Sequence, residues 1–301
     1  MDGIINVYKE SGFTSHDVVA KLRGILHFKK IGHTGTLDPE ALGVLPVCVG
    51  KATKVCDVLT DRDKTYRAVA KLGVTTDTLD LTGEILSRET VDVPEHRIRE
   101  VLGQFVGTIQ QIPPMYSAIK INGKKLYELA RQGKEVERAP RTVTIHEIRF
   151  LDYSEKESEV SFEVTCSKGT YIRTLCDDIG KKLGCGCAMK SLIRTRVGQF
   201  KVEDALTLSQ IEAMTKEQRL DAFVRPIDSV FTDYISCHVI ESGMKKLING
   251  NYLDIRDCEC PVDQTLQDGQ KVRIYGNDGE FYALYQFDAK KKQYRIVKNF
   301  H

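Results

Sequence analysis

The chain has 301 residues, of which 41% are hydrophobic, so it is long enough for one large domain and a smaller one. Its formal net charge is only +2, which excludes a uniformly basic nucleic-acid binder; an RNA-binding protein of this composition must gather its Lys and Arg on one face. No run of about 18 apolar residues occurs, so we expect no transmembrane helix and no membrane partner.

The nine cysteines are an odd number, and no apolar secretory segment precedes them. We therefore expect reduced thiols and a cytoplasmic protein. Cys185 and Cys187 are separated by one residue, as are Cys258 and Cys260, whereas paired zinc ligands are usually about two to four residues apart. This spacing favours buried thiols over a metal site, and we expect no metal.

The first predicted elements are a strand over residues 4–8 and a helix over residues 16–26. Apolar residues recur along the second segment at helical spacing, and Ser15 is the expected N-cap. A loop and a short apolar run over residues 44–49 follow, and the loop contains Asp38.

The loop reads Gly32-His33-Thr34-Gly35-Thr36-Leu37-Asp38-Pro39-Glu40-Ala41-Leu42-Gly43-Val44-Leu45-Pro46. Its glycines free the backbone for positive φ or close approach, and Pro39 biases Asp38 away from helical conformation. A carboxylate held on a stiff turn before a strand suits a nucleophile or a base. A polar turn capped by its own Asp side chain explains the residues alone equally well.

The middle of the chain alternates between strand-like and helix-like segments. The predicted strands are residues 64–73, 142–150 and 159–166. The predicted helices are residues 53–59, 95–102, 126–132 and 205–214, with a further helix opened by a glycine turn at Gly169. Asn122-Gly123 predicts a tight hairpin turn.

The most basic stretch of the chain runs from residue 120 to residue 141. Its basic residues are Lys120, Lys124, Lys125, Arg131, Lys134, Arg138 and Arg141. Tyr116 and Tyr127 lie among them. Basic residues clustered beside turns, with aromatic residues interleaved, favour RNA contact over an ordinary solvated face.

The sequence changes character after Pro226-Ile227-Asp228. From about residue 235 it contains turn signals and alternating strands over residues 271–275 and 281–287. Short strands joined by turns predict a small β-barrel. We therefore expect a large domain over residues 1–230 and a small β-rich domain over residues 235–301.

Four motifs together resemble the TruB family of pseudouridine synthases, and they occur in the order found in that family. They are the loop of residues 32–46, Lys64-Thr65-Tyr66, Gly169-Thr170-Tyr171-Ile172-Arg173, and Leu192-Ile193-Arg194-Thr195. The resemblance covers about the first 230 residues, and the C-terminal part resembles a PUA-type RNA-binding domain more weakly. Leu42 replaces a residue that is usually small, and Glu10 replaces the proline that follows the family's lysine at position 9.

The resemblance implies an α+β fold. It consists of a large mixed, mostly antiparallel sheet with a central cleft, an RNA-gripping insertion at about residues 110–145, and a small C-terminal β-rich PUA-like domain. The implied activity is that of a stand-alone tRNA pseudouridine-55 synthase, an isomerase that converts uridine to pseudouridine in the TΨC loop after flipping the base, without a cofactor. We expect a monomer that binds the TΨC stem-loop of tRNA and uses no guide RNA.

By the same resemblance the catalytic residues are Asp38, Tyr66 and Arg173. Arg173 would orient the Asp38 carboxylate, and Tyr66 would stack on the flipped uracil or move a proton. Asp38 could attack C1′, attack C6 or remove a sugar proton, and the sequence leaves these open. The implied substrate or RNA contacts are His33, Lys64, Tyr171, Leu192 and Lys9.

The main alternative is a non-catalytic RNA-binding or tRNA-folding protein on the same scaffold. Asp38, Tyr66 and Arg173 together favour the enzyme, because a protein that only binds RNA does not need all three. A relative that depends on a guide RNA is a further alternative. The compact chain, which has no long basic tail, argues against it.

Overall fold

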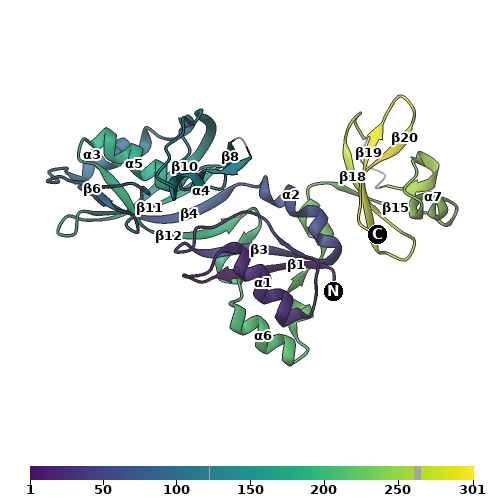
Figure 1. Ribbon diagram of the computed structural model, residues 1–301. Coiled ribbons are helices and arrows are strands. Elements are labelled where there is room, and N and C mark those ends of the chain that lie inside the picture. Colours follow the sequence, from purple (N-terminus) through teal and green to yellow (C-terminus); the bar gives the residue numbers. More distant parts are fainter. Residues whose placement is uncertain (122, 261–265) are drawn as a thin grey trace.

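The computed structural model describes residues 1–121, 123–260 and 266–301. Most strands form one ten-stranded sheet (Figure 1). These strands are β1 (Gly3–Lys9), β2 (Ile31–His33), β3 (Leu42–Val49), β4 (Lys64–Leu72), β7 (Gly107–Gln111), β10 (Arg141–Ser154), β11 (Glu159–Cys166), β12 (Cys187–Val197), β13 (Phe200–Lys201) and β14 (Val224–Arg225). The order is β14-β1-β3-β12-β4-β11-β10-β7, with β2 beside β3 and β13 beside β12. The pairs are antiparallel except β3 with β12, which confirms the predicted mixed, mostly antiparallel sheet.

The longer helices flank this sheet in two groups. In one group α3 (Glu95–Gly103) packs against α5 (Ile172–Leu183), and these helices also contact β10 and β12. In the other group α1 (Ser15–Leu26) packs against α6 (Leu208–Lys216) (Figure 1). The shorter helices are α2 (Cys56–Thr60), α4 (Leu126–Ala130) and α7 (Met244–Ile248). In the described part of the chain, no helix has the length and apolar character needed to cross a membrane.

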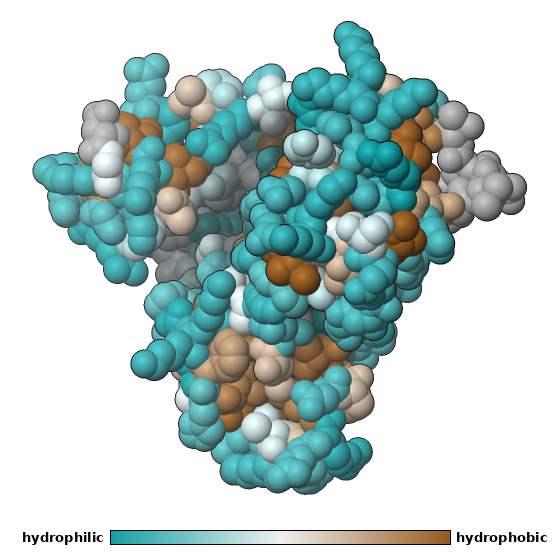
Figure 2. Space-filling view, turned by 90° about the vertical axis from the view of Figure 1, so that its right-hand side faces the viewer, coloured by the Kyte–Doolittle hydropathy of each residue, from teal (hydrophilic) through white to brown (hydrophobic). Residues whose placement is uncertain are grey.

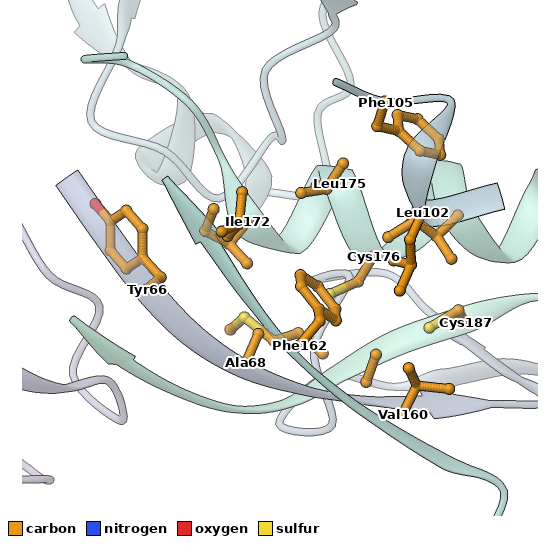
Figure 3. Close-up of a cluster of buried hydrophobic side chains, with 14 of the residues drawn as sticks. Tyr66, Ala68, Leu102, Phe105, Val160, Phe162, Ile172, Leu175, Cys176 and Cys187 are labelled. Atoms are coloured by element: carbon orange, nitrogen blue, oxygen red, sulfur yellow. The ribbon is translucent and has the colours of Figure 1, made fainter. Parts of the chain in front are cut away.

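The core beside α3 and α5 follows from the two-residue period of the strands. On β4 every second side chain, from Tyr66 to Leu72, is buried in one cluster, and Phe162 joins it from β11. Residues of α5 such as Ile172 and Leu175 cover this cluster (Figure 3). Tyr66 lies at the edge of the cluster, with its hydroxyl directed away from the other labelled side chains. Strand β4 therefore places the aromatic side chain of Tyr66 at the margin of this core.

Strand β12 is absent from the sequence prediction, although it lies at the centre of the sheet between β3 and β4. Its register against β4 shifts twice, between Met189 and Ser191 and between Arg194 and Arg196. Each irregularity breaks the two-residue alternation by which strands are recognised. The strand also contains a completely buried arginine, Arg194, which no hydropathy pattern predicts.

Other local differences concern helix starts. Thr14, and not Ser15, caps α1: its hydroxyl accepts from the Asp17 N–H at 3.1 Å, and the Asp17 carboxylate accepts from the Thr14 N–H at 2.9 Å. The helix predicted over residues 53–59 is a 3₁₀ turn, Gly50–Val55, followed by α2. The helix predicted from residue 205 begins only after its cap at Thr207.

Two small hairpins complete the large unit. They are β5 (Val74–Thr76) with β6 (Ile85–Arg88), and β8 (Lys120–Ile121) with β9 (Lys124–Lys125). Asn122 of the predicted Asn-Gly turn lies outside the described residues. Gly123 has φ +81°, the left-handed conformation that glycine adopts readily.

A second sheet of six strands forms the C-terminal unit (Figure 1). Its order is β16-β20-β19-β18-β15-β17. The strands are β15 (Ile235–Val239), β16 (Leu253–Asp254), β17 (Cys258–Glu259), β18 (Lys271–Tyr275), β19 (Phe281–Asp288) and β20 (Gln293–Asn299). Leu284 and Phe300 of this unit are buried in one cluster with Phe231, Ile4 and Cys48, so the two units share a hydrophobic core.

The expectation that all thiols are reduced is wrong for one pair. Cys237 and Cys260 form a disulfide. Residue 237 lies beside β17 because His238 pairs with Glu259 in the antiparallel register. Pairing across strands brings the two residues together, and spacing along the sequence could not show it.

One face of the molecule shows how its apolar residues are distributed. The face shown in Figure 2 is mainly hydrophilic, and its apolar residues lie in separate groups. Such scattered apolar residues are ordinary for a folded chain and do not by themselves mark an interface.

The capping of α1 provides a test of the local structure. Thr14→Ala should lower the free energy of unfolding by about 0.5–2 kcal/mol, because the helix loses a hydroxyl that accepts from its first turn. Thermal or urea unfolding measures the effect. Thr14→Ser keeps the acceptor and should remain close to the original stability; equal losses in both variants would contradict the assigned cap.

Candidate active site

The loop that contains Asp38 joins β2 to β3 and is held by other elements. The Ser15 hydroxyl at the start of α1 accepts from the Leu37 N–H at 2.9 Å. The Lys9 Nζ donates to the Pro39 carbonyl at 2.8 Å, and the Gly12 N–H donates to the same carbonyl at 3.1 Å. Asp38 is therefore bracketed by two anchored residues, which fixes its backbone.

Gly43 is needed where the loop enters β3. Its φ is +103°, and a Cβ at this position would collide with the carbonyl of Arg194 on β12. The neighbouring Leu42, which departs from the family pattern, pairs with Ile193 in the parallel register between β3 and β12. The close approach of these strands brings the loop up against β12.

Arg173 holds the Asp38 carboxylate at two points. Its Nε lies 3.0 Å from Oδ2, and its Nη2 donates to Oδ1 at 3.1 Å. The Arg173 side chain, in the first turn of α5, is only 7% exposed, whereas the Asp38 side chain is 41% exposed. This two-point contact fixes the carboxylate plane and leaves part of it accessible to a substrate.

The remaining donors of Arg173 are also used. Nη2 donates to the Tyr116 carbonyl at 2.8 Å, and Nη1 donates to the Thr78 carbonyl at 3.2 Å. Nη1 also lies 3.5 Å from the Asp80 carboxylate. The guanidinium is therefore oriented by backbone and by a second carboxylate, as well as by Asp38.

Asp80 is a residue of the site that the sequence analysis missed. Its carboxylate is mostly buried and accepts from the Thr78 hydroxyl at 2.8 Å and from the Thr82 N–H at 3.0 Å. In the sequence it is one of several polar residues in a loop, and only the fold brings it to Arg173. The repeated Asp and Thr residues there were a signal for a turn and gave no indication of chemistry.

The ionisation of Asp38 depends on opposing effects. Burial raises the pKa of Asp38, the Arg173 charge lowers it, the Asp80 charge raises it and the Lys9 charge lowers it. The net effect is a pKa above the ordinary value for aspartate. A less solvated carboxylate of raised pKa is a stronger base than an exposed one.

Tyr66 and Leu192 come from adjacent strands of the same core. Tyr66 is buried in the cluster that also contains Leu37 of the loop, and Leu192 on β12 pairs with Ala68 on β4. Burial raises the pKa of the Tyr66 phenol. The structure therefore brings Tyr66 and Leu192 to the side of the loop that contains Asp38.

Lys9 and Lys64, both predicted as RNA or substrate contacts, are buried. The Lys9 Nζ donates to the Glu10 and Pro39 carbonyls, and the Lys64 Nζ donates to the Thr60 and Arg62 carbonyls. Burial lowers the pKa of each to about 8. The amino groups of Lys9 and Lys64 thus fix the backbone segments whose carbonyls accept their hydrogen bonds.

His33 and Tyr171 lie at two edges of the site. The His33 ring is half-buried, its Nδ1 accepts from the Gly35 N–H at 3.4 Å, and burial lowers its pKa. Tyr171 precedes α5, and its backbone exchanges two hydrogen bonds with the buried Gln111 side chain, at 2.9 and 3.0 Å. Gln111 is a second residue that the sequence analysis missed, because a glutamine in a strand carries no recognisable signal.

The basic stretch divides into engaged and free side chains. Arg138 donates to the Pro113 carbonyl and pairs with Glu135, and Lys125 and Arg131 lie over the Tyr127 ring. Other basic residues of the stretch are exposed: Lys120, Lys124, Lys134 and Arg141. For the residues described by the structure, no group of three or more His, Cys, Asp or Glu could hold a metal ion.

Comparison with family models covers most of the chain. Residues 23–172 match the model described as TruB family pseudouridylate synthase (N terminal domain). Residues 173–232 match the model described as tRNA pseudouridylate synthase B C-terminal domain. The first match includes the loop that contains Asp38, and the boundary between the two falls at Arg173.

Similar proteins and structures extend the comparison to the full length. A protein named tRNA pseudouridine synthase B from Lachnoclostridium phytofermentans is 55% identical, with 100% of each chain covered. One of the same name from Limosilactobacillus reuteri is 42% identical, with 100% of this chain and 99% of the relative covered.

Solved structures with a similar fold include an H/ACA RNP bound to a substrate RNA containing 2'-deoxyuridine, at 28% identity and TM-score 0.74. A Cbf5-Nop10-Gar1 complex gives 30% identity and the same TM-score. Each match covers 99% of this chain and 85% of the other. The identity to full-length relatives and the family-model matches show that the chain belongs to the TruB family of pseudouridylate synthases.

Proposed function

We propose that the protein converts uridine to pseudouridine at position 55 in the TΨC loop of tRNA, with Asp38 as its catalytic carboxylate. The observation that carries this proposal is the two-point contact of Arg173 with a partly accessible Asp38 beside Tyr66. The names of the full-length relatives, tRNA pseudouridine synthase B, support tRNA as the substrate.

The reaction is an isomerisation that needs no electron acceptor. The C1′–N1 bond breaks, the uracil turns, a C1′–C5 bond forms, and a proton leaves C5 while N1 gains one. Asp38 takes part as an ionised group, whether it attacks C1′, attacks C6 or removes a sugar proton. Its fixed orientation against Arg173 reduces the reorganisation that each of these steps requires.

The other site residues have roles that fit a flipped base. Tyr66 provides a ring for the uracil and a hydroxyl that moves a proton, and Leu192 forms a wall of the pocket. His33 fills space left by the extruded nucleotide, which lowers the cost of unstacking. Tyr171 supports the start of α5 and thus Arg173. Lys9 and Lys64 act by holding backbone near the site.

The RNA would extend beyond this site over the basic stretch and the C-terminal unit. Residues 1–230 form the proposed catalytic domain, residues 110–145 the RNA-gripping insertion, and residues 235–301 a PUA-like RNA-binding domain. The exposed lysines and Arg141 of the insertion support phosphate contact. We propose a cytoplasmic monomer that binds the TΨC stem-loop directly and takes no guide RNA.

Asp38→Asn tests the proposal. It should abolish pseudouridine formation and leave tRNA affinity within a few-fold, because the shape of the surface hardly changes. The measurement is mapping of pseudouridine by position in an unmodified tRNA transcript, together with a binding titration. The exposed pair Asp61–Lys168 offers a control, and Asp61→Asn should retain activity. Product at position 55 from Asp38→Asn, or wild-type product only at other positions, would contradict the proposal.

Arg173→Lys should be almost as damaging as Arg173→Ala. Lysine retains a charge but loses the planar group that holds both carboxylate oxygens. Breaking a buried pair costs about 3–5 kcal/mol, and half of that in the transition state slows the reaction about 10–100-fold. Single-turnover kinetics at saturating enzyme measure the effect. Arg99→Lys, in an exposed pair on α3, is the control; a normal rate for Arg173→Lys would refute the two-point role.

Asp80→Asn should move the acidic limb of the single-turnover rate to lower pH. The Asp80 charge raises the pKa of Asp38, so its removal lowers that pKa and keeps Asp38 ionised in more acidic solution. Asp177→Asn is a matched control, since Asp177 lies on α5 but pairs with Lys181. A limb that moves to higher pH in Asp80→Asn would contradict the assigned influence.

A further inference from the structure

Arg194 is the largest completely buried side chain of the described residues, at 1% exposure. It lies on the central strand β12, directly opposite Tyr66 on β4, and in parallel register beside Gly43 on β3. Residues paired in this way project from the same face of a sheet. Arg194 therefore lies between the strand of Tyr66 and the strand that follows the loop containing Asp38.

The hydrogen bonds of Arg194 go to both sides of this loop. Its Nε donates to the Val44 carbonyl at 2.7 Å, and its Nη1 donates to the Thr36 carbonyl at 3.4 Å. Thr36 precedes Asp38 in the chain, and Val44 follows it. The acceptors are backbone carbonyls, so the contacts fix the guanidinium in place without neutralising its charge.

One nitrogen of the guanidinium is left over. Within the part of the chain that the structure describes, the buried Nη2 has no hydrogen-bond partner. An unsatisfied buried donor is costly, more so on a charged group, and such groups are rare in folded proteins. The two carbonyl contacts therefore leave part of the Arg194 guanidinium unengaged.

The two buried arginines act on different members of the site. Arg173 contacts Asp38, whereas the Arg194 charge acts on Tyr66 and also on His33, Lys9 and Lys64.

The groups that act on the Tyr66 phenol come from three other elements. They are Arg194 on β12, Cys166 on β11, and Asp38 in the loop between β2 and β3. Burial, Cys166 and Asp38 raise the pKa of Tyr66, and Arg194 lowers it. The Arg194 guanidinium thus counteracts the rise in the pKa of Tyr66 that burial causes.

We propose that Arg194 is a positioning residue for the tRNA-modifying reaction, which places a fixed positive charge opposite Tyr66 and stabilises the negative charge left on the phenol oxygen when its proton leaves. This rests on the proposed function, in which Tyr66 touches the uracil. Arg173 and Arg194 then have different roles. Arg173 orients the Asp38 carboxylate, and Arg194 stabilises the ionised form of the Tyr66 phenol. The Val44 and Thr36 carbonyls hold the Arg194 guanidinium in place.

The experiment compares Arg194→Gln, Arg194→Lys and a control on the same strand, Arg196→Gln. Arg196 donates to the Thr65 hydroxyl and the Gly198 carbonyl, not to the loop that contains Asp38. Single-turnover pseudouridine formation in an unmodified tRNA transcript is measured at saturating enzyme from about pH 6 to about pH 11, a range that extends above the ordinary tyrosine pKa of about 10 because the pKa of Tyr66 is raised. Thermal unfolding of each variant is recorded in parallel.

In Arg194→Gln the limb of the profile governed by Tyr66 should move to higher pH, because the phenol loses the charge that lowers its pKa. Its rate near neutral pH should fall about 10–100-fold, as expected for loss of a charged partner. Arg194→Lys keeps the charge and should keep the limb at its wild-type position, and Arg196→Gln should leave the profile unchanged.

An Arg194→Gln profile with the limb unmoved would overturn the inference, even if the rate fell, because the residue would then serve folding alone. If Arg194→Gln does not fold, Arg194→Lys decides: a limb at the wild-type position supports the inference, and a limb at higher pH overturns it. Failure of the wild-type enzyme to form pseudouridine at position 55 would instead count against the proposed function.

Discussion

The structure depends on keeping one carboxylate, Asp38, partly buried and yet ionisable. Burial works against ionisation, and the Arg173 guanidinium works for it through two contacts. This balance requires a loop that cannot move away and an arginine that cannot turn. The anchoring of the loop by Ser15 and Lys9, and the holding of Arg173 by the Tyr116 and Thr78 carbonyls, meet these two requirements.

The central strand connects these parts. Because β12 lies between β3 and β4, it contacts the strand that follows Asp38 on one side and the strand of Tyr66 on the other. The parallel pairing with β3 is short and depends on Gly43, whose missing side chain lets the backbones approach. The geometry of the site is thus a property of strand order, and no single loop could produce it.

Prediction from the sequence succeeded where a pattern was local. Alternation identified β4 and β11, and the ordered motifs identified the loop of Asp38 and its partner Arg173, which the structure brings together. It failed for β12, whose bulges and buried arginine break the alternation. Asp80 and Gln111 escaped because their importance comes only from neighbours distant in the chain. The cap of α1 was misplaced by one residue, since Thr14 and Ser15 are both good caps and only Ser15 is needed by Leu37.

The shared hydrophobic cluster beneath β3 affects how the C-terminal unit can be exchanged in evolution or engineering. Leu284 and Phe300 complete a core that also contains Ile4 and Cys48 of the larger unit and Phe231 at its end, and Lys298 pairs with Asp57 across the same junction. A domain joined only by a linker can be swapped at the linker. Here a chimera made by cutting near residue 235 would expose apolar surface on both pieces, so a transplanted unit must bring matching partners for Phe231 and its neighbours.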